Sequence, residues 1–423
     1  MKMKQMHGIL LLTLLLLFAT VGAQEKAGFR IEDPENHGFS PERLERLSEN
    51  LERELKIRQT PGAAILILRH GVIVYEKTFG LQDMVTEQPM ELNSIFRIYS
   101  MTKPITSVAV MMLWEQGYFK LNDPVSKYIP ELSKMKVGIE NEDQSEIISQ
   151  VKPGREITIQ DLLRHTSGIT YGLFGVPTAV QKMYITSNLS PANQTSQQFI
   201  ETLAQMPLID HPGKRWEYGY STDVLGRLVE IISAMTLAEF FDQYILAPLK
   251  MEDTGFHIPE HKLHRAAQGF DYTTKTYPTY LKNVAHPPKM HSGGGGLVST
   301  LYDYARFSQM MLNGGELDGV RLLSPKTVAL MTSNHVGENV DKGDLYLPGP
   351  GYGFGLGYAV RLETGLSASA GSQGDFRWGG WAGTGTWIDP MEEMIAIYMM
   401  QDVGSSGYLR DRFKNLVYQA IIK

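Results

Sequence analysis

A serine and a lysine three residues further on are a pair that can do acyl-transfer chemistry. The chain contains this spacing at three places: Ser100/Lys103, Ser133/Lys136 and Ser149/Lys152. In a covalent hydrolase the serine hydroxyl attacks an acyl carbon, and a lysine without its proton can activate that hydroxyl. The second and third pairs belong to a polar, charged stretch around residues 134–158, where a lysine stays solvated and protonated. We therefore take Ser100 and Lys103 as the candidate nucleophile and base.

The segment that follows Ser100 can position this pair. Residues 104–116 are apolar nearly all round, which predicts a buried helix that Ser100 opens. Residues three apart share a helix face, and the N–H groups of the first turn are available to an oxyanion. Pro104 is tolerated in that turn because first-turn N–H groups have no partner within the helix. Apolar surroundings disfavour a charged amine and so favour a neutral Lys103. The alternative is a serine that only caps the helix, with Lys103 extended to solvent.

The remaining pattern places strands at both ends of the chain and helices between them. Residues 62–80 predict a β-hairpin, and residues 352–358 and 376–400 a second strand-rich region. Further helices are predicted at 196–205, 221–235, 238–247, 301–313, 325–333 and 408–422. The order favours an α+β fold, a three-layer α/β/α sandwich with an antiparallel sheet built from both termini and a helical region inserted.

Four segments resemble the motifs of one enzyme family. Residues 96–107, Phe-Arg-Ile-Tyr-Ser-Met-Thr-Lys-Pro-Ile-Thr-Ser, resemble the nucleophile motif of serine β-lactamase-related hydrolases. This family contains class C β-lactamases, penicillin-binding carboxypeptidases and β-lactamase-like esterases. Residues 157–169, 212–226 and 294–306 resemble three further family segments, in the family's order.

The resemblance covers roughly residues 40–420 and implies the β-lactamase/penicillin-binding-protein fold. We expect a single hydrolase domain at 24–423. Its sheet part would comprise about 40–100 and 290–423, and its helical part about 101–289. The active site would lie in the cleft between the two parts.

The resemblance also implies a role for each site residue. Ser100 would be the nucleophile, Lys103 its base, and Tyr218 the proton relay between the serine oxygen and the leaving group. Tyr220, two residues further on, competes for the relay role and is otherwise expected to bind substrate. The Trp216-x-Tyr218 spacing favours Tyr218.

A second motif would complete the site. Trp378-Gly379-Gly380-Trp381 stands where the family carries Lys/His-Thr/Ser-Gly, and it resembles the variant of the esterase-like branch. Trp378, Gly379 and Gly380 would line the substrate site. The backbone N–H groups of Ser100 and Trp381 would form the oxyanion hole, whose donors are each worth about 2.7–4 kcal/mol in acyl transfer.

Two departures from the family pattern bear on the substrate. Trp378 cannot pair with a substrate carboxylate as a cation would, and Tyr220 stands where an asparagine is usual. Both favour a neutral acyl substrate. The predicted function is therefore an exported serine hydrolase that cleaves a small-molecule ester through a Ser100 acyl-enzyme, without metal or cofactor.

Two alternatives stay open. One is a D-amino-acid peptidase or weak β-lactamase acting on cell-wall material, which would need a cation near Trp378, such as the adjacent Arg377. The other is a non-catalytic, penicillin-binding-like sensor on the same fold. No G-x-S-x-G nucleophile elbow and no H-E-x-x-H metal motif occurs in the sequence.

Composition and the N-terminus bear on class and location. The chain has no cysteine and a formal net charge of -6 without basic blocks, so disulfides are excluded and nucleic acid is not an expected partner. Residues 1–23 have the pattern of an export signal: two early lysines, an apolar run and Val21-Gly22-Ala23 as a cleavage site. We expect a periplasmic or extracellular mature protein without stable membrane insertion. The alternative is a retained N-terminal anchor.

Overall fold

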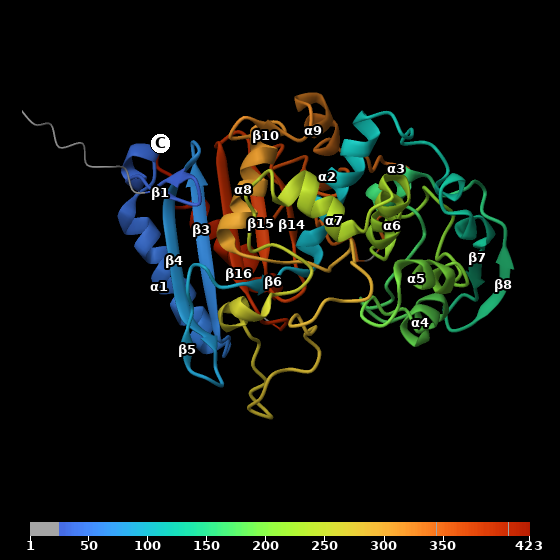
Figure 1. Ribbon diagram of the computed structural model, residues 1–423, viewed down its shortest axis with the longest axis horizontal. Helices are drawn as coiled ribbons and strands as arrows, with labels where there is room; N and C mark the ends of the chain where they lie inside the picture. Colours follow the sequence, from blue (N-terminus) through green and yellow to red (C-terminus); the bar gives the residue numbers. More distant parts are fainter. Residues whose placement is uncertain (1–24, 344, 405) are drawn as a thin grey trace, which may run out of the picture.

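One antiparallel sheet joins the two ends of the chain. The computed structural model describes residues 25–343, 345–404 and 406–423, so the expected export signal at 1–23 lies outside the described residues. The sheet has eight strands in the order β12-β13-β14-β15-β16-β3-β4-β5 (Figure 1). From one edge to the other these are Tyr352–Phe354, Ala359–Arg361, Phe376–Gly379, Gly385–Asp389, Met394–Met400, Gly62–Arg69, Val72–Asp83 and Gln88–Pro89.

The N-terminal and C-terminal parts of the sheet meet at β3 and β16. These strands pair antiparallel from Met394 opposite Arg69 to Met400 opposite Ala63. All eight residues of β3 are buried, which fits a strand that is covered on both faces. Ile65 and Ile67 point into one hydrophobic core, while Leu66 points into the other.

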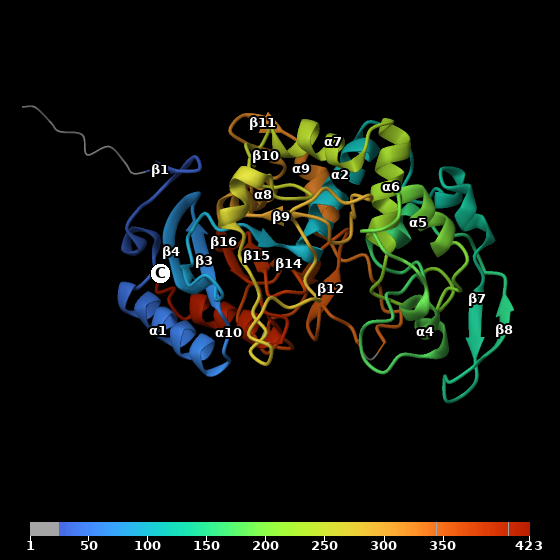
Figure 2. The same cartoon turned by 60° about the horizontal axis from the view of Figure 1, so that its bottom comes forward.

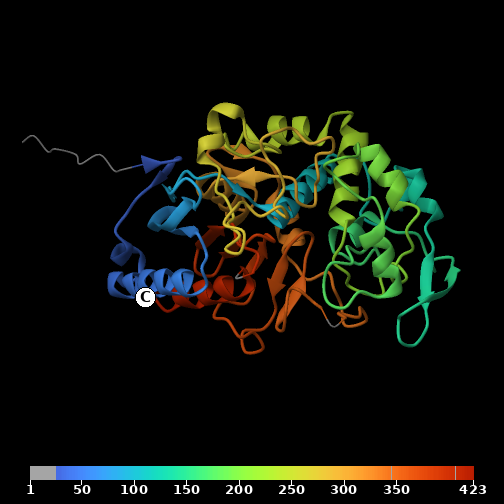
Figure 3. The same cartoon turned by 90° about the horizontal axis from the view of Figure 1, so that it is seen from below.

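Each face of the sheet carries its own helices, which makes three layers (Figures 2 and 3). Helices α1 (Pro41–Ile57) and α10 (Ser406–Tyr418) lie side by side on one face. Helices α2 (Thr102–Glu115) and α8 (Leu301–Leu312) cover the other. The predicted α+β sandwich, with its sheet built from both termini, is confirmed.

The helical part lies beyond α2, on the right in Figure 1. Its helices are α3 (Ile159–Leu163), α4 (Ala179–Thr186), α5 (Ser196–Leu203), α6 (Ser221–Ser233) and α7 (Leu237–Phe241), the last continued by a π-helical turn at Asp242–Leu246. Helix α9 (Pro325–Met331) follows α8. The shorter strands are β1 (Glu25–Lys26), β2 (Phe29–Arg30), β6 (Phe96–Arg97), β9 (Val298–Ser299), β10 (Glu316–Leu317) and β11 (Val320–Arg321).

Several elements differ from the sequence predictions, and the short helices α3 and α4 are among those not predicted. Helix α1 is not among the predicted helices, although Ser40 caps it, Pro41 begins it, and its leucines recur at helical spacing. The polar, charged stretch 134–158, for which no strand is predicted, contains a hairpin of β7 (Val137–Glu140) and β8 (Ile147–Val151). Within the described ranges, no helix has the length and apolar character needed to cross a membrane.

Candidate active site

Ser100 lies in a strained turn rather than at the start of the helix. The structure places it in a 3-10 turn, η2 (Tyr99–Met101), immediately before α2. The preceding residue, Tyr99, has φ of 42°, a left-handed conformation that is uncommon for a bulky side chain. Such a conformation costs roughly 1–3 kcal/mol and persists only where its surroundings enforce it. Here β6 pairs with β9 on one side of the turn, and the Tyr99 hydroxyl accepts a hydrogen bond from the Lys282 N–H at 3.1 Å.

Lys103 is buried directly beneath the serine. Its Nζ lies 3.3 Å from Ser100 Oγ, 3.1 Å from Tyr171 Oη and 2.6 Å from the carbonyl oxygen of Gly294. A neutral amine has two hydrogens and one lone pair. If the hydrogens point to Gly294 and Tyr171, the lone pair faces the serine hydroxyl. The contacts therefore allow Lys103 to accept a proton from Ser100 and, once charged, to donate to all three oxygens.

The Gly294 carbonyl, which accepts from Lys103, belongs to a loop that a buried aspartate holds in place. Asp223, in the first turn of α6, accepts hydrogen bonds from Ser292 Oγ at 2.5 Å and from the Gly294 N–H at 3.2 Å. A Cβ on Gly294 would lie 2.3 Å from Asp223 Oδ2, so only glycine fits there. Burial raises the pKa of the Asp223 carboxyl, while the charge of Lys103 and the hydrogen bonds from Ser292 and Gly294 oppose this effect. Asp223 thus positions the loop that orients Lys103.

Tyr218 lies on the other side of the lysine. Its ring centroid is 4.6 Å from Lys103 Nζ, and its hydroxyl oxygen accepts a hydrogen bond from Trp378 Nε1 at 3.2 Å. The indole can only donate, so the phenolic hydrogen of Tyr218 stays available to another acceptor. The motif residue Trp378 is therefore a hydrogen-bond donor to the proposed relay.

Two motif glycines allow close approaches around strand β14. A Cβ on Gly380 would lie 2.4 Å from the carbonyl oxygen of Ile98, so glycine lets the strand approach the Ser100 turn. A Cβ on Gly379 would lie 1.8 Å from Nη1 of Arg410, whose side chain reaches this point from α10. Burial lowers the pKa of Arg410, and the nearby charge of Arg377 lowers it further.

One cavity of about 190 Å³ brings most of the predicted site residues together. It is lined by Ser100, Phe174, Tyr218, Leu347, Arg377, Trp378, Gly379, Gly380, Trp381 and Arg410. Lys103 is buried behind Ser100 and is 1% exposed. Tyr220 does not line this cavity; its ring packs against Tyr171 at 4.4 Å and Phe199 at 5.3 Å. Burial raises the pKa of Tyr220.

Some functional neighbours could not be singled out from the sequence. Tyr171 lies two residues beyond the family segment 157–169, and Asp223 lies inside the tyrosine segment, so both had a positional signal but no assigned role. Arg410 belongs to the C-terminal helix and had none. Arg377, considered as a replacement cation, does line the cavity; it donates to the Pro348 carbonyl at 2.8 Å and lies over the ring of Tyr352.

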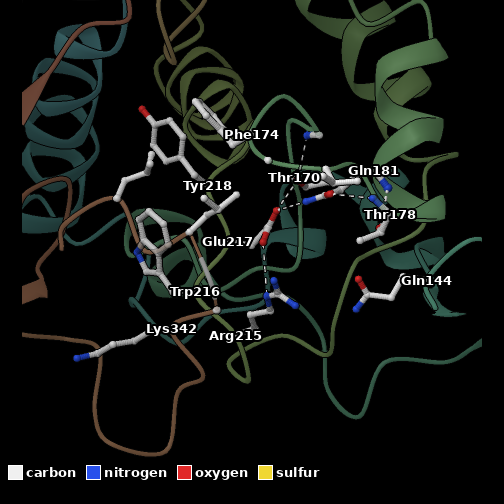
Figure 4. A pocket seen from close by; sticks show the side chains of 16 residues that line it. Gln144, Thr170, Phe174, Thr178, Gln181, Arg215, Trp216, Glu217, Tyr218 and Lys342 are labelled. Atoms are coloured by element: carbon white, nitrogen blue, oxygen red, sulfur yellow. Dashed lines mark hydrogen bonds and ion pairs between the residues drawn. The ribbon is translucent and has the colours of Figure 1, made fainter. Parts of the chain in front are cut away.

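A larger cavity of about 400 Å³ adjoins the first (Figure 4). The two cavities share Phe174, Tyr218 and Leu347 as lining residues, so these side chains separate them. Within the described residues no group of three or more His, Cys, Asp or Glu side chains is placed to hold a metal ion.

Comparison with known proteins identifies the family. The Beta-lactamase family model matches residues 47–420. The protein Rv1367c of Mycobacterium tuberculosis is 34% identical over 80% of this chain and 85% of its own length. Esterase EstB of Burkholderia gladioli is 27% identical over 88% of this chain and 94% of its own.

A solved structure gives the same result at the level of the fold. EstCE1, described as a hydrolase with promiscuous acyltransferase activity, superposes with a TM-score of 0.73 and 25% identity, covering 90% of this chain and 99% of that one. With the family model spanning most of the chain and an esterase among its relatives, the protein belongs to the beta-lactamase family and is a serine hydrolase.

Proposed function

We propose that the protein hydrolyses small-molecule carboxylic esters through a covalent acyl-enzyme on Ser100. The observation that carries this proposal is the contact of Lys103 Nζ with Ser100 Oγ at 3.3 Å, with Gly294 and Tyr171 taking the other hydrogens of the amine. The resemblance to an esterase and to a hydrolase supports it. A lysine that accepts the proton of a neighbouring serine is a recognised way to activate that hydroxyl.

The proposed reaction conserves all atoms of ester and water. Lys103 takes the Ser100 proton as Oγ attacks the ester carbon, and the N–H groups of Ser100 and Trp381 receive the developing oxyanion. The proton passes through Tyr218 to the alcohol oxygen as the C–O bond breaks and the alcohol leaves. Water then attacks the acyl-enzyme, yielding the acid and restoring the serine hydroxyl.

A second candidate is cell-wall peptide or β-lactam chemistry. It would require a cation close to Trp378, and Arg377 and Arg410 both line the catalytic cavity. These two side chains supply the type of charge that a substrate carboxylate needs. Labelling with a penicillin separates this candidate from the esterase.

The test is intact-mass labelling of the protein with a fluorophosphonate and, separately, with a penicillin. We expect one phosphonate adduct on the wild type and none on Ser100→Ala. Ser133→Ala is the matched control, because Ser133 belongs to another Ser-x-x-Lys pair and is exposed. A phosphonate adduct that survives in Ser100→Ala contradicts the proposed nucleophile, and a penicillin adduct moves the assignment to the second candidate.

We also propose that the protein is exported. The charged start, apolar run and small-residue cleavage site within residues 1–23 support this proposal. The test is cell fractionation with the full chain and with a chain that starts at Gln24. Equal retention of both in the cytoplasm would contradict export.

A further inference from the structure

The larger cavity adjoins the catalytic one and offers space for the part of the substrate that leaves as the alcohol in the proposed reaction. Tyr218, which would return the proton to the departing oxygen, lines both this cavity and the catalytic one. The alcohol oxygen has to be near that hydroxyl when the bond breaks. The part of the substrate beyond the alcohol oxygen can therefore extend past Phe174 and Leu347 into about 400 Å³ of space, a volume typical of ligand sites.

The two sides of this cavity differ in chemistry (Figure 4). Phe174, Trp216 and Tyr218 form an aromatic side, where Trp216 and Tyr218 are stacked with ring centroids 6.0 Å apart. Gln144, Thr170, Thr178 and Gln181 form the opposite, polar side. Arg215 and Glu217 lie between them.

Arg215 and Glu217 leave hydrogen-bonding capacity open. Glu217 Oε1 accepts from Thr170 Oγ1 at 2.6 Å and from Gln181 Nε2 at 3.1 Å. Glu217 Oε2 lies 3.6 Å from Arg215 Nε, which is too far for a hydrogen bond. Arg215 Nε and Trp216 Nε1 are buried donors without a partner in the described structure. The guanidinium of Arg215 needs an acceptor and Glu217 Oε2 needs a donor, so a group that both accepts and donates can satisfy this pair.

The backbone keeps this pair in place. The Trp216 N–H donates to the carbonyl of Asp341 at 2.8 Å, and the Glu217 N–H donates to the carbonyl of His165 at 2.8 Å. Because the segment is fixed on both sides, the arginine and the glutamate are presented to the cavity together. This preorganisation lowers the cost of binding a ligand there.

The charges decide which kind of ligand fits. Glu217 and Arg215 balance each other, and the Lys342 ammonium points away from them in Figure 4. An anionic group would meet the Glu217 carboxylate, while an apolar group would cover both charged side chains without replacing water. A hydroxyl can accept from the guanidinium and donate to the carboxylate at the same time.

We propose that the leaving group of the natural substrate is a neutral, hydroxyl-rich alcohol such as a sugar or another polyol. Its hydroxyls bind Arg215 and Glu217, and its carbon skeleton packs against Phe174. This inference rests on the proposed esterase function and specifies the substrate class of that same site.

The experiment compares two butyrate esters that share a six-membered ring and a CH₂–O linkage, 6-O-butyrylglucose and cyclohexylmethyl butyrate. The measured quantity is the ratio of their kcat/KM values. Glu217→Gln is the main variant, because an amide oxygen can still accept from Thr170 and Gln181. Arg215→Gln is the second variant. Glu42→Gln is the matched control, since Glu42 is 86% exposed on α1.

We expect the wild type to hydrolyse the sugar ester and the ratio to fall about tenfold or more in Glu217→Gln and Arg215→Gln, because each loses a partner for a substrate hydroxyl. Glu42→Gln should keep the wild-type ratio. An unchanged ratio in both cavity variants, or a wild type that hydrolyses only the cyclohexylmethyl ester, overturns the inference and leaves the esterase standing. If neither ester is hydrolysed, or if hydrolysis persists in Ser100→Ala, the proposed function itself fails.

Discussion

Replacing Trp378 by phenylalanine tests the proposed proton relay most directly. The change removes the indole N–H that donates to Tyr218 Oη at 3.2 Å and keeps an aromatic ring in the strand. If the Tyr218 oxygen carries negative charge while it relays the proton, the variant loses a hydrogen bond to a charged group. Such a hydrogen bond is worth about 1.5–3 kcal/mol. At about 1.36 kcal/mol per factor of ten, kcat should fall roughly 10- to 160-fold.

The assay can separate loss of the relay from loss of packing. We would measure kcat for ethyl butyrate, whose alkoxide needs a proton to leave, and for p-nitrophenyl butyrate, whose phenolate does not. The decrease should be larger for the ethyl ester. Trp387→Phe is the control, because Trp387 is 5% exposed in the same sheet and its Nε1 has no partner in the described structure.

Both variants remove the same atoms from a buried site, so comparable losses of stability are expected. Urea unfolding checks that expectation. Equal losses of kcat in the two variants, or equal losses for the two esters in Trp378→Phe, would refute the assignment of Tyr218 as the relay to the leaving group.

Three further outcomes are expected. Gly294→Ala places a Cβ 2.3 Å from an Asp223 oxygen and should lower kcat at least about tenfold. Gly295→Ala, whose Cβ would have its nearest contact at 3.7 Å, should leave kcat unchanged. Steady-state kinetics of both variants tests this prediction. Tyr171→Phe removes the hydroxyl that lies 3.1 Å from the Lys103 amine. Because such a hydrogen bond is worth about 0.5–1.5 kcal/mol, kcat should fall roughly 2- to 12-fold. An unchanged kcat would show that this hydrogen bond does not assist the lysine. Burial, with the lysine charge adding to it, holds the pKa of His165 well below its usual 6.5, so acidification protonates the unfolded chain first. Stability should therefore fall below about pH 6.5 by up to about 1.36 kcal/mol per pH unit, and urea unfolding of His165→Asn should show a shallower dependence.

The sequence was sufficient for the sheet and for the helices with a strong apolar pattern. The hairpin at 62–80 and the strands at 376–400 have continuous apolar runs broken by clear turns, and the structure has strands in both places. The helices α3 and α4 carry capping boxes but are only five and eight residues long, so periodicity gives them little signal. In the hairpin at 134–158 the second strand, β8, is mostly exposed and lacks the apolar alternation that marks a strand.

For the site, local motifs point to candidate residues but not to their partners. Spacing within the chain placed Ser100 beside Lys103, because three residues make almost one helical turn. The hydrogen bond between Trp378 and Tyr218 joins positions 160 residues apart and depends on how the sheet packs against the helical part. The same holds for the Gly294 carbonyl, 191 residues from the lysine that donates to it. Such contacts depend on tertiary packing, which no short motif encodes.

The contact between Gly379 and Arg410 has a consequence for how this site can change by mutation. The guanidinium occupies the space that any larger residue at 379 would need for its Cβ, which would lie 1.8 Å from Nη1. A threonine or serine at 379 would thus be accommodated only if the arginine on the C-terminal helix moved or was replaced. Because the end of the arginine side chain has to shift for any side chain at 379, the two positions are expected to be epistatic. A change of this site to the Lys-Thr-Gly type would therefore involve Arg410 of α10 as well as the strand.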